Sequence, residues 1–151
     1  VFTLSAWRPD AAADRAFVDA LRRHYKRVWF FPQMQDDWAY FRGFGWDDIG
    51  MVPPSTPGYT RFLDENDVDV VGTRLHGGIR AIQRGRRALI LAIDNRAAEI
   101  GRDTGLPVAD RKDTAAIEAW IEGGAATTVA LPLEAIAAWK AQFQTPGAAR
   151  P

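Results

Sequence analysis

Residues 68–85, VDVVGTRLHGGIRAIQRG, contain the change from strand to helix on which the predicted fold most depends. The first six residues are apolar almost throughout, which is typical of a central parallel strand covered on both faces. A short helical pattern follows the two adjacent glycines and ends at Gly85, a residue type that favours helix termination. The strand therefore delivers Arg74 and His76, two positions apart, to the start of a helix.

Strand patterns and helical patterns alternate along the rest of the chain. The expected strands are 1–4, 28–31, 68–73, 88–93 and a short run from 108, and the expected helices are one capped by Asp10, one after Gly77, 96–104, one capped by Asp113, and 133–143. Residues 35–59 are expected to be irregular, and 59–66 to form a short helix. This alternation predicts an α/β fold with one doubly wound, mostly parallel, Rossmann-like sheet. The domain spans residues 1–144, and residues 145–151 are expected to form a frayed tail.

The composition is that of an ordinary globular domain, with 151 residues of which 47% are hydrophobic and 25% charged. Basic and acidic residues number 19 each, so the net charge is zero and no nucleic acid or anionic membrane is an expected partner. Cysteine is absent and histidine occurs twice, which excludes a thiol nucleophile and a metal site made of histidines alone. No signal peptide or run of membrane-spanning length is visible, so a cytoplasmic location is expected.

Arg74, Leu75 and His76 follow the expected central strand at its carboxyl end, where ligands bind in open α/β sheets. Gly77 and Gly78 let a ligand approach the first turn of the helix, whose unpaired N–H groups favour an anion. The guanidinium of Arg74 fits a carboxylate or a phosphate, and His76 can transfer a proton near neutral pH. These residues predict an anionic substrate and a proton-transfer step.

Structural roles compete with this interpretation at each position. The two glycines can form a simple turn, the histidine can be satisfied structurally, and Arg74 can pair with Asp69 or Asp94. The conjunction of all of them at the ligand end of the sheet makes the functional interpretation as good as the structural one. Arg8 also leaves the carboxyl end of a strand, and it can point into the same crevice.

Other polar clusters have plainer explanations. His24 lies among basic residues on a helix and is expected to be solvated, and Arg80 and Arg84 share a helix face that is expected to be solvated too. The acidic pairs 36–37 and 47–48 offer oxygen ligands to a divalent cation, but neither a metal nor a cofactor is expected.

Residues 68–107, VDVVGTRLHGGIRAIQRGRRALILAIDNRAAEIGRDTGLP, resemble the polysaccharide pyruvyl transferase family. The carboxyl-terminal half of that family carries a strand, an Arg-Leu-His-Gly signature and a helix. Residues 3–9, TLSAWRP, look like the opening strand of the same half, which typically ends in a Ser-x-x-Arg-like turn. The resemblance covers the chain to about residue 110, and its specific part is the Arg-Leu-His-Gly signature.

The resemblance implies one half of a two-domain architecture similar to the GT-B glycosyltransferases. It also implies transfer of the pyruvyl skeleton of phosphoenolpyruvate to a sugar of a cell-surface polysaccharide, as a pyruvate ketal. Arg74, Leu75, His76 and Gly77 would then lie at the phosphoenolpyruvate site, with His76 as the proton-transfer residue and Arg74 as an anion clamp. Arg8 would be a second clamp.

The chain also departs from this family. Ile93 and Arg96 stand where the family often has tyrosine and lysine. Val1 begins inside a strand pattern, so the chain is expected to be a cut piece. The resemblance implies that an amino-terminal domain, expected to supply the acceptor surface, is absent from this chain. The aromatic residues of 38–46 are expected either to face the cleft and stack on sugars or, as the better alternative, to pack an insertion or a domain interface. An apolar stripe on 133–143 would promote a homodimer if it were exposed.

Two other functions stay open from the sequence alone. A glycosyltransferase that uses a nucleotide sugar would place its donor at a similar crevice, although no acidic ribose partner follows a glycine-rich turn. A non-catalytic binding or regulatory module with a worn site is the second. Tighter binding of nucleotide diphosphates than of phosphoenolpyruvate would indicate the first of these, and unchanged turnover after His76→Ala in a full-length enzyme would indicate the second.

Overall fold

A computed structural model describes residues 1–143 of the chain, and within them it contains six strands and seven helices. The strands are β1 Phe2–Thr3, β2 Trp29–Phe30, β3 Gly50–Met51, β4 Val70–Gly72, β5 Ala88–Ala92 and β6 Val108–Asp110. The helices are α1 Ala11–His24, α2 Gln35–Arg42, α3 Thr56–Glu65, α4 Leu75–Gln83, α5 Asn95–Thr104, α6 Thr114–Gly123 and α7 Leu133–Ala141. The frayed tail predicted for 145–151 lies outside the described residues.

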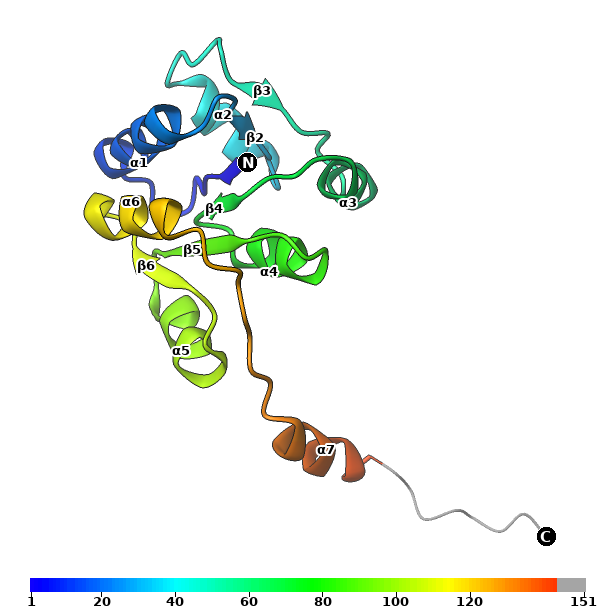
Figure 1. The fold of residues 1–151 in the computed structure, drawn as a ribbon. Coiled ribbons are helices and arrows are strands. Elements are labelled where there is room, and N and C mark those ends of the chain that lie inside the picture. Colours follow the sequence, from blue (N-terminus) through cyan, green and yellow to red (C-terminus); the bar gives the residue numbers. More distant parts are fainter. Residues whose placement is uncertain (144–151) are drawn as a thin grey trace, which may run out of the picture.

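All six strands are parallel and lie in the order β3-β2-β1-β4-β5-β6. Phe2 of β1 pairs with Val71 of β4, and Ile90 of β5 pairs with Val108 of β6. The helices alternate with these strands and cover both faces of the sheet, so the prediction of a doubly wound, Rossmann-like α/β fold is confirmed (Figure 1).

One face of the sheet packs against α1, α2 and α6. Phe17 of α1, Phe41 of α2 and Ile117 of α6 join Phe2 and Phe30 in a single buried cluster. The rings of Phe30 and Phe41 are stacked with centroids 4.3 Å apart. Since successive side chains of a strand point to opposite faces, the alternate strand residues are left to a second core.

The opposite face packs against α3, α4 and α5. Tyr59 of α3, Ala81 of α4 and Val70 of β4 belong to one buried cluster, and Ala97 of α5 packs with Ile90 in another. Figure 1 shows α3 and α4 on the side of the sheet away from α1 and α6. The two faces together give the layered core expected of this fold class.

The prediction that residues 35–59 are irregular is wrong for most of that stretch, because it contains α2, the edge strand β3 and the start of α3. Helix α3 begins at Thr56, where Ser55 accepts a hydrogen bond from the Gly58 N–H at 3.1 Å. Pro57 follows at the second helical position. Serine at the cap and proline in the first turn are helix-start signals as well as loop residues, so the same composition has two interpretations.

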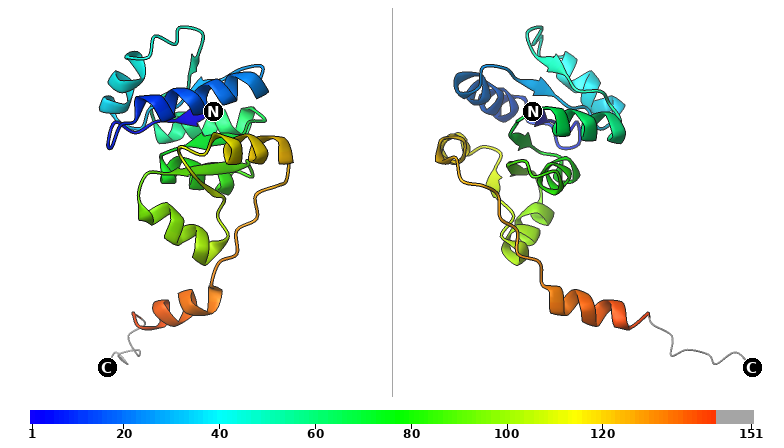
Figure 2. Two further views of the ribbon diagram at one scale, coloured as in Figure 1. Left: turned by 90° about the vertical axis from the view of Figure 1, so that its left-hand side faces the viewer. Right: turned by 45° about the vertical axis from the view of Figure 1, so that its right-hand side comes forward.

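After α6 the chain runs in an extended segment to α7, which stands apart from the sheet (Figure 2). This segment is tied to the body where Thr127 Oγ1 accepts the Ala88 N–H at 3.2 Å. Trp139 of α7 and Phe143, just after the helix, are 58% and 68% exposed, and their rings pack edge to face. The exposed stripe therefore exists, while the homodimer expected from it stays a prediction. No helix in residues 1–143 combines the length and the apolar character needed to cross a bilayer.

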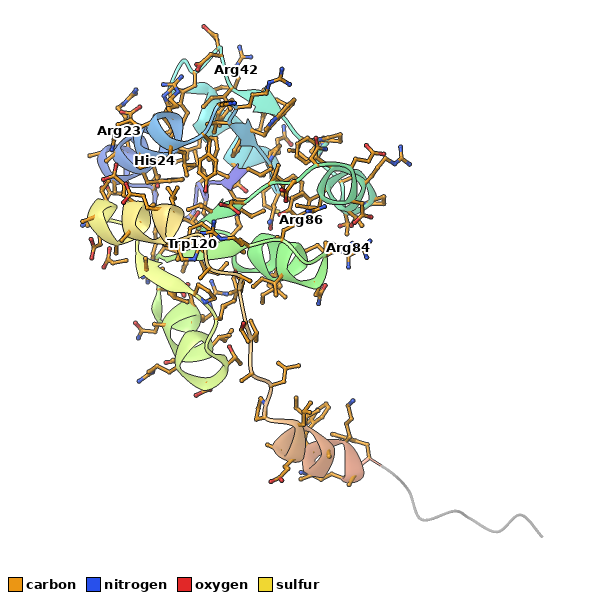
Figure 3. All side chains as sticks on the ribbon, in the orientation of Figure 1. Arg23, His24, Arg42, Arg84, Arg86 and Trp120 are labelled. Carbon is orange, nitrogen blue, oxygen red and sulfur yellow. The ribbon has the colours of Figure 1, made fainter. Side chains whose placement is uncertain are left out.

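Charged side chains link α1 to α6 at the outer edge of the first layer (Figure 3). Arg23 donates to Glu118 through Nε and Nη2, and His24 Nε2 lies 3.5 Å from the same carboxylate. His24, expected to be solvated, therefore faces an acidic partner. These hydrogen bonds, with that from Arg23 the largest influence, hold the pKa of Glu118 below its usual range.

We expect Glu118→Gln to lower the unfolding temperature at neutral pH and to lose this effect in acid. Because the pKa of Glu118 is lower in the folded state, its contribution is present above the unfolded value of about 4.3 and disappears as the pH falls through the folded pKa. Thermal unfolding of both proteins across this pH range measures the difference. Glu99→Gln, a glutamate of α5 with no ion pair in residues 1–143, is the control. A difference that stays constant with pH would contradict the assignment.

Candidate functional site

A crevice opens at the centre of the sheet, between the carboxyl ends of β1 and β4. These strands are neighbours, but α1 follows β1 on one face and α4 follows β4 on the other, so their loops diverge. Ligands of doubly wound folds bind at such a switch point. The crevice has a volume of about 240 Å³, and it is lined by Trp7 after β1, residues 73–76 after β4, and Asp94 and Arg96 after β5.

The amino end of α4 contributes backbone donors to this crevice. The N–H of Arg74, which precedes the first turn, donates to Thr3 Oγ1 at 3.2 Å. The N–H groups of Leu75 and His76 meet no acceptor in the described part of the chain. Free N–H groups and the helix dipole together favour an anion at this point.

Thr73 adds a hydroxyl to the same lining. Its side chain is buried, with 6% exposed, and its Oγ1 makes no hydrogen bond within residues 1–143. Buried hydroxyls are rarely left without a partner, so an orphan at a ligand crevice indicates a contact that a ligand completes. This observation is independent of the helix terminus and points to the same place.

The guanidinium of Arg74 is held by Asp37, which is fully buried. Arg74 Nε donates to Asp37 Oδ2 at 3.0 Å, and Arg74 Nη2 donates to Oδ1. The same carboxylate accepts the Ala6 N–H at 3.0 Å and the Met34 N–H at 3.2 Å. Asp37 therefore ties the loops after β1, β2 and β4 together. Arg74 keeps Nη1 for a ligand, but it is not the free anion clamp that the sequence suggested.

The carboxylates that the sequence offered as partners for Arg74 are engaged elsewhere. Asp69 pairs with Arg87 at 3.1 Å and Asp94 pairs with Arg96 at 2.8 Å. The hydrogen bond from Arg96 is the main reason that the pKa of Asp94 lies below its usual range. The sequence indicates Asp37 only as a cation ligand. No sequence signal links it to Arg74, which follows a strand end and lies 37 residues further along the chain.

His76 is the second residue of α4 and is exposed. It lines the crevice on one side and a second hollow, between α3 and α4, on the other. Its imidazole makes no hydrogen bond in the described residues and is therefore free to contact a ligand from either side. Leu75 lines the crevice beside it, whereas Gly77 lines only the second hollow.

Arg8 lies at the rim and is not among the residues that line the crevice. Its guanidinium packs over the ring of Trp7, 4.8 Å from the centroid, and donates to the Ile93 carbonyl at 3.4 Å. The backbone of Arg8 has φ 55°, an uncommon conformation for a residue other than glycine. Arg111 Nη1 donates a hydrogen bond to the Arg8 carbonyl at 3.0 Å. The structure thus brings Arg74, Leu75 and His76 together, and Trp7 separates Arg8 from them.

The two glycines of the signature lie inside α4, which begins at Leu75 and not after Gly77 as expected. A Cβ on Gly77 would lie 2.5 Å from Gln33 Nε2, and one on Gly78 would lie 2.1 Å from Ile90 Cδ1. Gly78 therefore allows α4 to pack closely on the buried Ile90, whereas at Gly77 the neighbour is the flexible end of the Gln33 side chain. Close ligand approach at these glycines stays a prediction.

The aromatic residues expected to face a cleft belong mainly to the core. Phe41 and Trp46 are 4% and 5% exposed, and both pack against Phe2. The expectation of a sugar-stacking surface there is not supported, because α2 turns these rings inward onto the sheet. Arg80 and Arg84, expected to be solvated, donate to Thr60 and Asp64 of α3. Residues 1–143 contain no cluster of three or more histidine, aspartate and glutamate side chains able to hold a metal ion.

The fold and the crevice define an α/β protein of the Rossmann-like class with a crevice at its switch point, where free N–H groups of a helix start favour an anion. Searches of family models, of curated proteins and of solved structures found no match for the chain.

Proposed function

We propose that this chain is the phosphoenolpyruvate-binding half of a polysaccharide pyruvyl transferase. The observation that carries the proposal is one small crevice in which free N–H groups of α4, the orphan hydroxyl of Thr73, Arg74 and His76 converge. Phosphoenolpyruvate carries a carboxylate and a phosphate on a small carbon frame, and these donors match its negative charge. The Arg-Leu-His-Gly signature supports the same family.

The proposed reaction forms a ketal from phosphoenolpyruvate and two sugar hydroxyls. The methylene carbon gains a proton through the double-bond electrons, which makes the adjacent carbon electrophilic. Two hydroxyl oxygens bond to that carbon, and its bond to the phosphate oxygen breaks with the electron pair leaving on phosphate. Of the two hydroxyl protons, one ends on the methylene carbon and the other on the released phosphate, so atoms and charge balance.

In this proposal His76 handles the proton, because it is exposed at the crevice and an imidazole can donate or accept near neutral pH. The α4 N–H groups and Thr73 bind one anionic group of the donor. Arg74, oriented by Asp37, offers Nη1 to the other. Arg8 adds positive charge at the rim, beside Trp7.

Calorimetric titration with phosphoenolpyruvate tests the proposal, since binding needs only the donor half. Thr73→Val keeps the shape of the side chain and removes the hydroxyl. We expect it to weaken binding about tenfold or more, as for loss of a hydrogen bond of about 1.5–3 kcal/mol to a charged group. Arg74→Ala should abolish binding and His76→Ala should weaken it. Arg84→Ala, at the C-cap of the same helix and outside the crevice, should bind like the wild type.

Two results would argue against the proposed function. Wild-type protein that shows no binding at millimolar phosphoenolpyruvate would contradict the donor site itself. Tighter binding of uridine diphosphate than of phosphoenolpyruvate would favour a glycosyltransferase that uses a nucleotide sugar.

A further inference from the structure

A second hollow, of about 460 Å³, lies between the first turn of α3 and the length of α4, from His76 to Gln83. It is on the face of the sheet opposite α1 and α2, and the loop after β2 forms its inner end. Its volume falls within the range of about 300–1,000 Å³ that is typical of small-molecule sites. Since the crevice at the switch point holds about 240 Å³, the hollow suits the larger of two ligands.

The hollow and the crevice adjoin each other at Gln33 and His76, which line both. Gln33 Nε2 packs against the α4 backbone at Gly77, so closely that a Cβ at this position would lie 2.5 Å from it. The imidazole of His76 therefore stands between the two spaces. A ligand in the hollow and an anion in the crevice would meet at this side chain.

The floor of the hollow is a fixed aromatic pair. The rings of Phe31 and Tyr59 are stacked with centroids 3.9 Å apart, and both residues are buried. The Tyr59 hydroxyl donates to the Gly77 carbonyl at 3.0 Å, which fastens α3 to the first turn of α4. The floor is thus preorganised with respect to His76 and needs no rearrangement to accept a ligand.

The walls of the hollow combine polar side chains with the apolar Pro32, Pro54 and Ile79, and no carboxylate is among the described residues that line it. Gln33 and Gln83 supply amides, which can both donate and accept hydrogen bonds. Arg80 donates to Thr60 Oγ1 at 3.0 and 3.1 Å and to Gln83 Oε1 at 3.4 Å, so most of its donors are already occupied. Amides above an aromatic floor are suited to a ligand that presents many hydroxyl groups.

From these contacts we propose that the α3–α4 hollow is the acceptor site, and that it binds a sugar residue whose hydroxyl passes His76 to reach the donor. This inference rests on the proposed function. It places both substrates on this one domain, whereas the family resemblance implies an acceptor surface on a second domain. Two hydroxyl oxygens of that sugar bond to the central carbon of phosphoenolpyruvate as its bond to the phosphate oxygen breaks. One hydroxyl proton passes through His76 to the methylene carbon, and the other ends on the released phosphate. Gln33 and Gln83 are then specificity-determining residues for the acceptor.

The test follows backbone amide resonances of the chain by NMR during titration with methyl glucoside, methyl galactoside and methyl mannoside. At least one of the three glycosides is expected to shift the amide resonances of Gly77, Ile79 and Gln83. Phosphoenolpyruvate is expected to shift those of Leu75 and Ala97. Gln83→Trp fills the hollow and should weaken glycoside binding at least about tenfold, with phosphoenolpyruvate binding unchanged. Arg84→Trp, one residue further along and outside the hollow, should leave both titrations unchanged.

The outcomes separate this inference from the proposed function. If phosphoenolpyruvate binds and the glycosides shift no resonance of the hollow, or if Gln83→Trp leaves their binding intact, the acceptor site is wrong and the donor site stands. If the glycosides bind in the hollow but phosphoenolpyruvate does not bind, the hollow is a carbohydrate site and pyruvyl transfer is wrong. Absence of both kinds of binding would overturn both proposals.

Discussion

Asp37→Ala is expected to lower the free energy of unfolding by about 3–5 kcal/mol, the usual cost of removing one partner of a buried ion pair. The Asp37 side chain is fully buried, and it accepts hydrogen bonds from the guanidinium of Arg74 and from the N–H groups of Ala6 and Met34. Its removal leaves a cation and two backbone donors without acceptors. Urea-induced unfolding, followed by circular dichroism, measures the loss.

A double-mutant cycle identifies the cause of that loss. Arg74→Met removes the charge while it keeps an unbranched apolar side chain, so Asp37→Ala combined with Arg74→Met should be more stable than Asp37→Ala alone. Asp36→Ala is the matched control, because that side chain is exposed and its change should stay within about 0.5 kcal/mol. If Asp37→Ala were as mild as Asp36→Ala, the carboxylate would have no structural role.

The sequence predicted the layers of this fold and the place of its candidate ligand site for the same physical reason. Residues 68–73 are apolar enough to be a central strand, and a parallel central strand must deliver the residues that follow it to the carboxyl edge. Arg74, Leu75 and His76 lie there in the structure, at the start of α4. Periodicity and strand order suffice for such a prediction, since neither depends on a distant partner.

The partners of those residues could not be predicted, because they come from crossovers far away in the chain. The helix α2 that carries Asp37 lies in a segment whose aromatic and acidic composition resembles a loop. Arg8 leaves its strand as expected, but a φ of 55° and the ring of Trp7 turn its guanidinium to the rim. The second hollow depends on how α3 packs beside α4, which is a tertiary contact without a local signal.

Leu75→Pro is expected to weaken phosphoenolpyruvate binding by about tenfold or more while the helix stays intact, because an N–H bond to an anion contributes about 1.5–3 kcal/mol. Leu75 is the first residue of α4, where proline is tolerated, and Arg74 before it has the extended backbone that a following proline requires. Proline removes one of the two N–H groups that lack an acceptor within residues 1–143.

Leu75→Ala is the control for the Leu75→Pro variant, because it removes the packing of the leucine side chain and keeps the N–H group. Calorimetry with phosphoenolpyruvate, and with inorganic phosphate as a second anion, should show a loss for the proline variant that is much larger than for the alanine variant. Unfolding temperatures close to each other would confirm that the helix start is preserved. Equal affinities of the two variants would mean that the backbone of α4 does not bind the anion, and the donor would then have to be held by side chains alone.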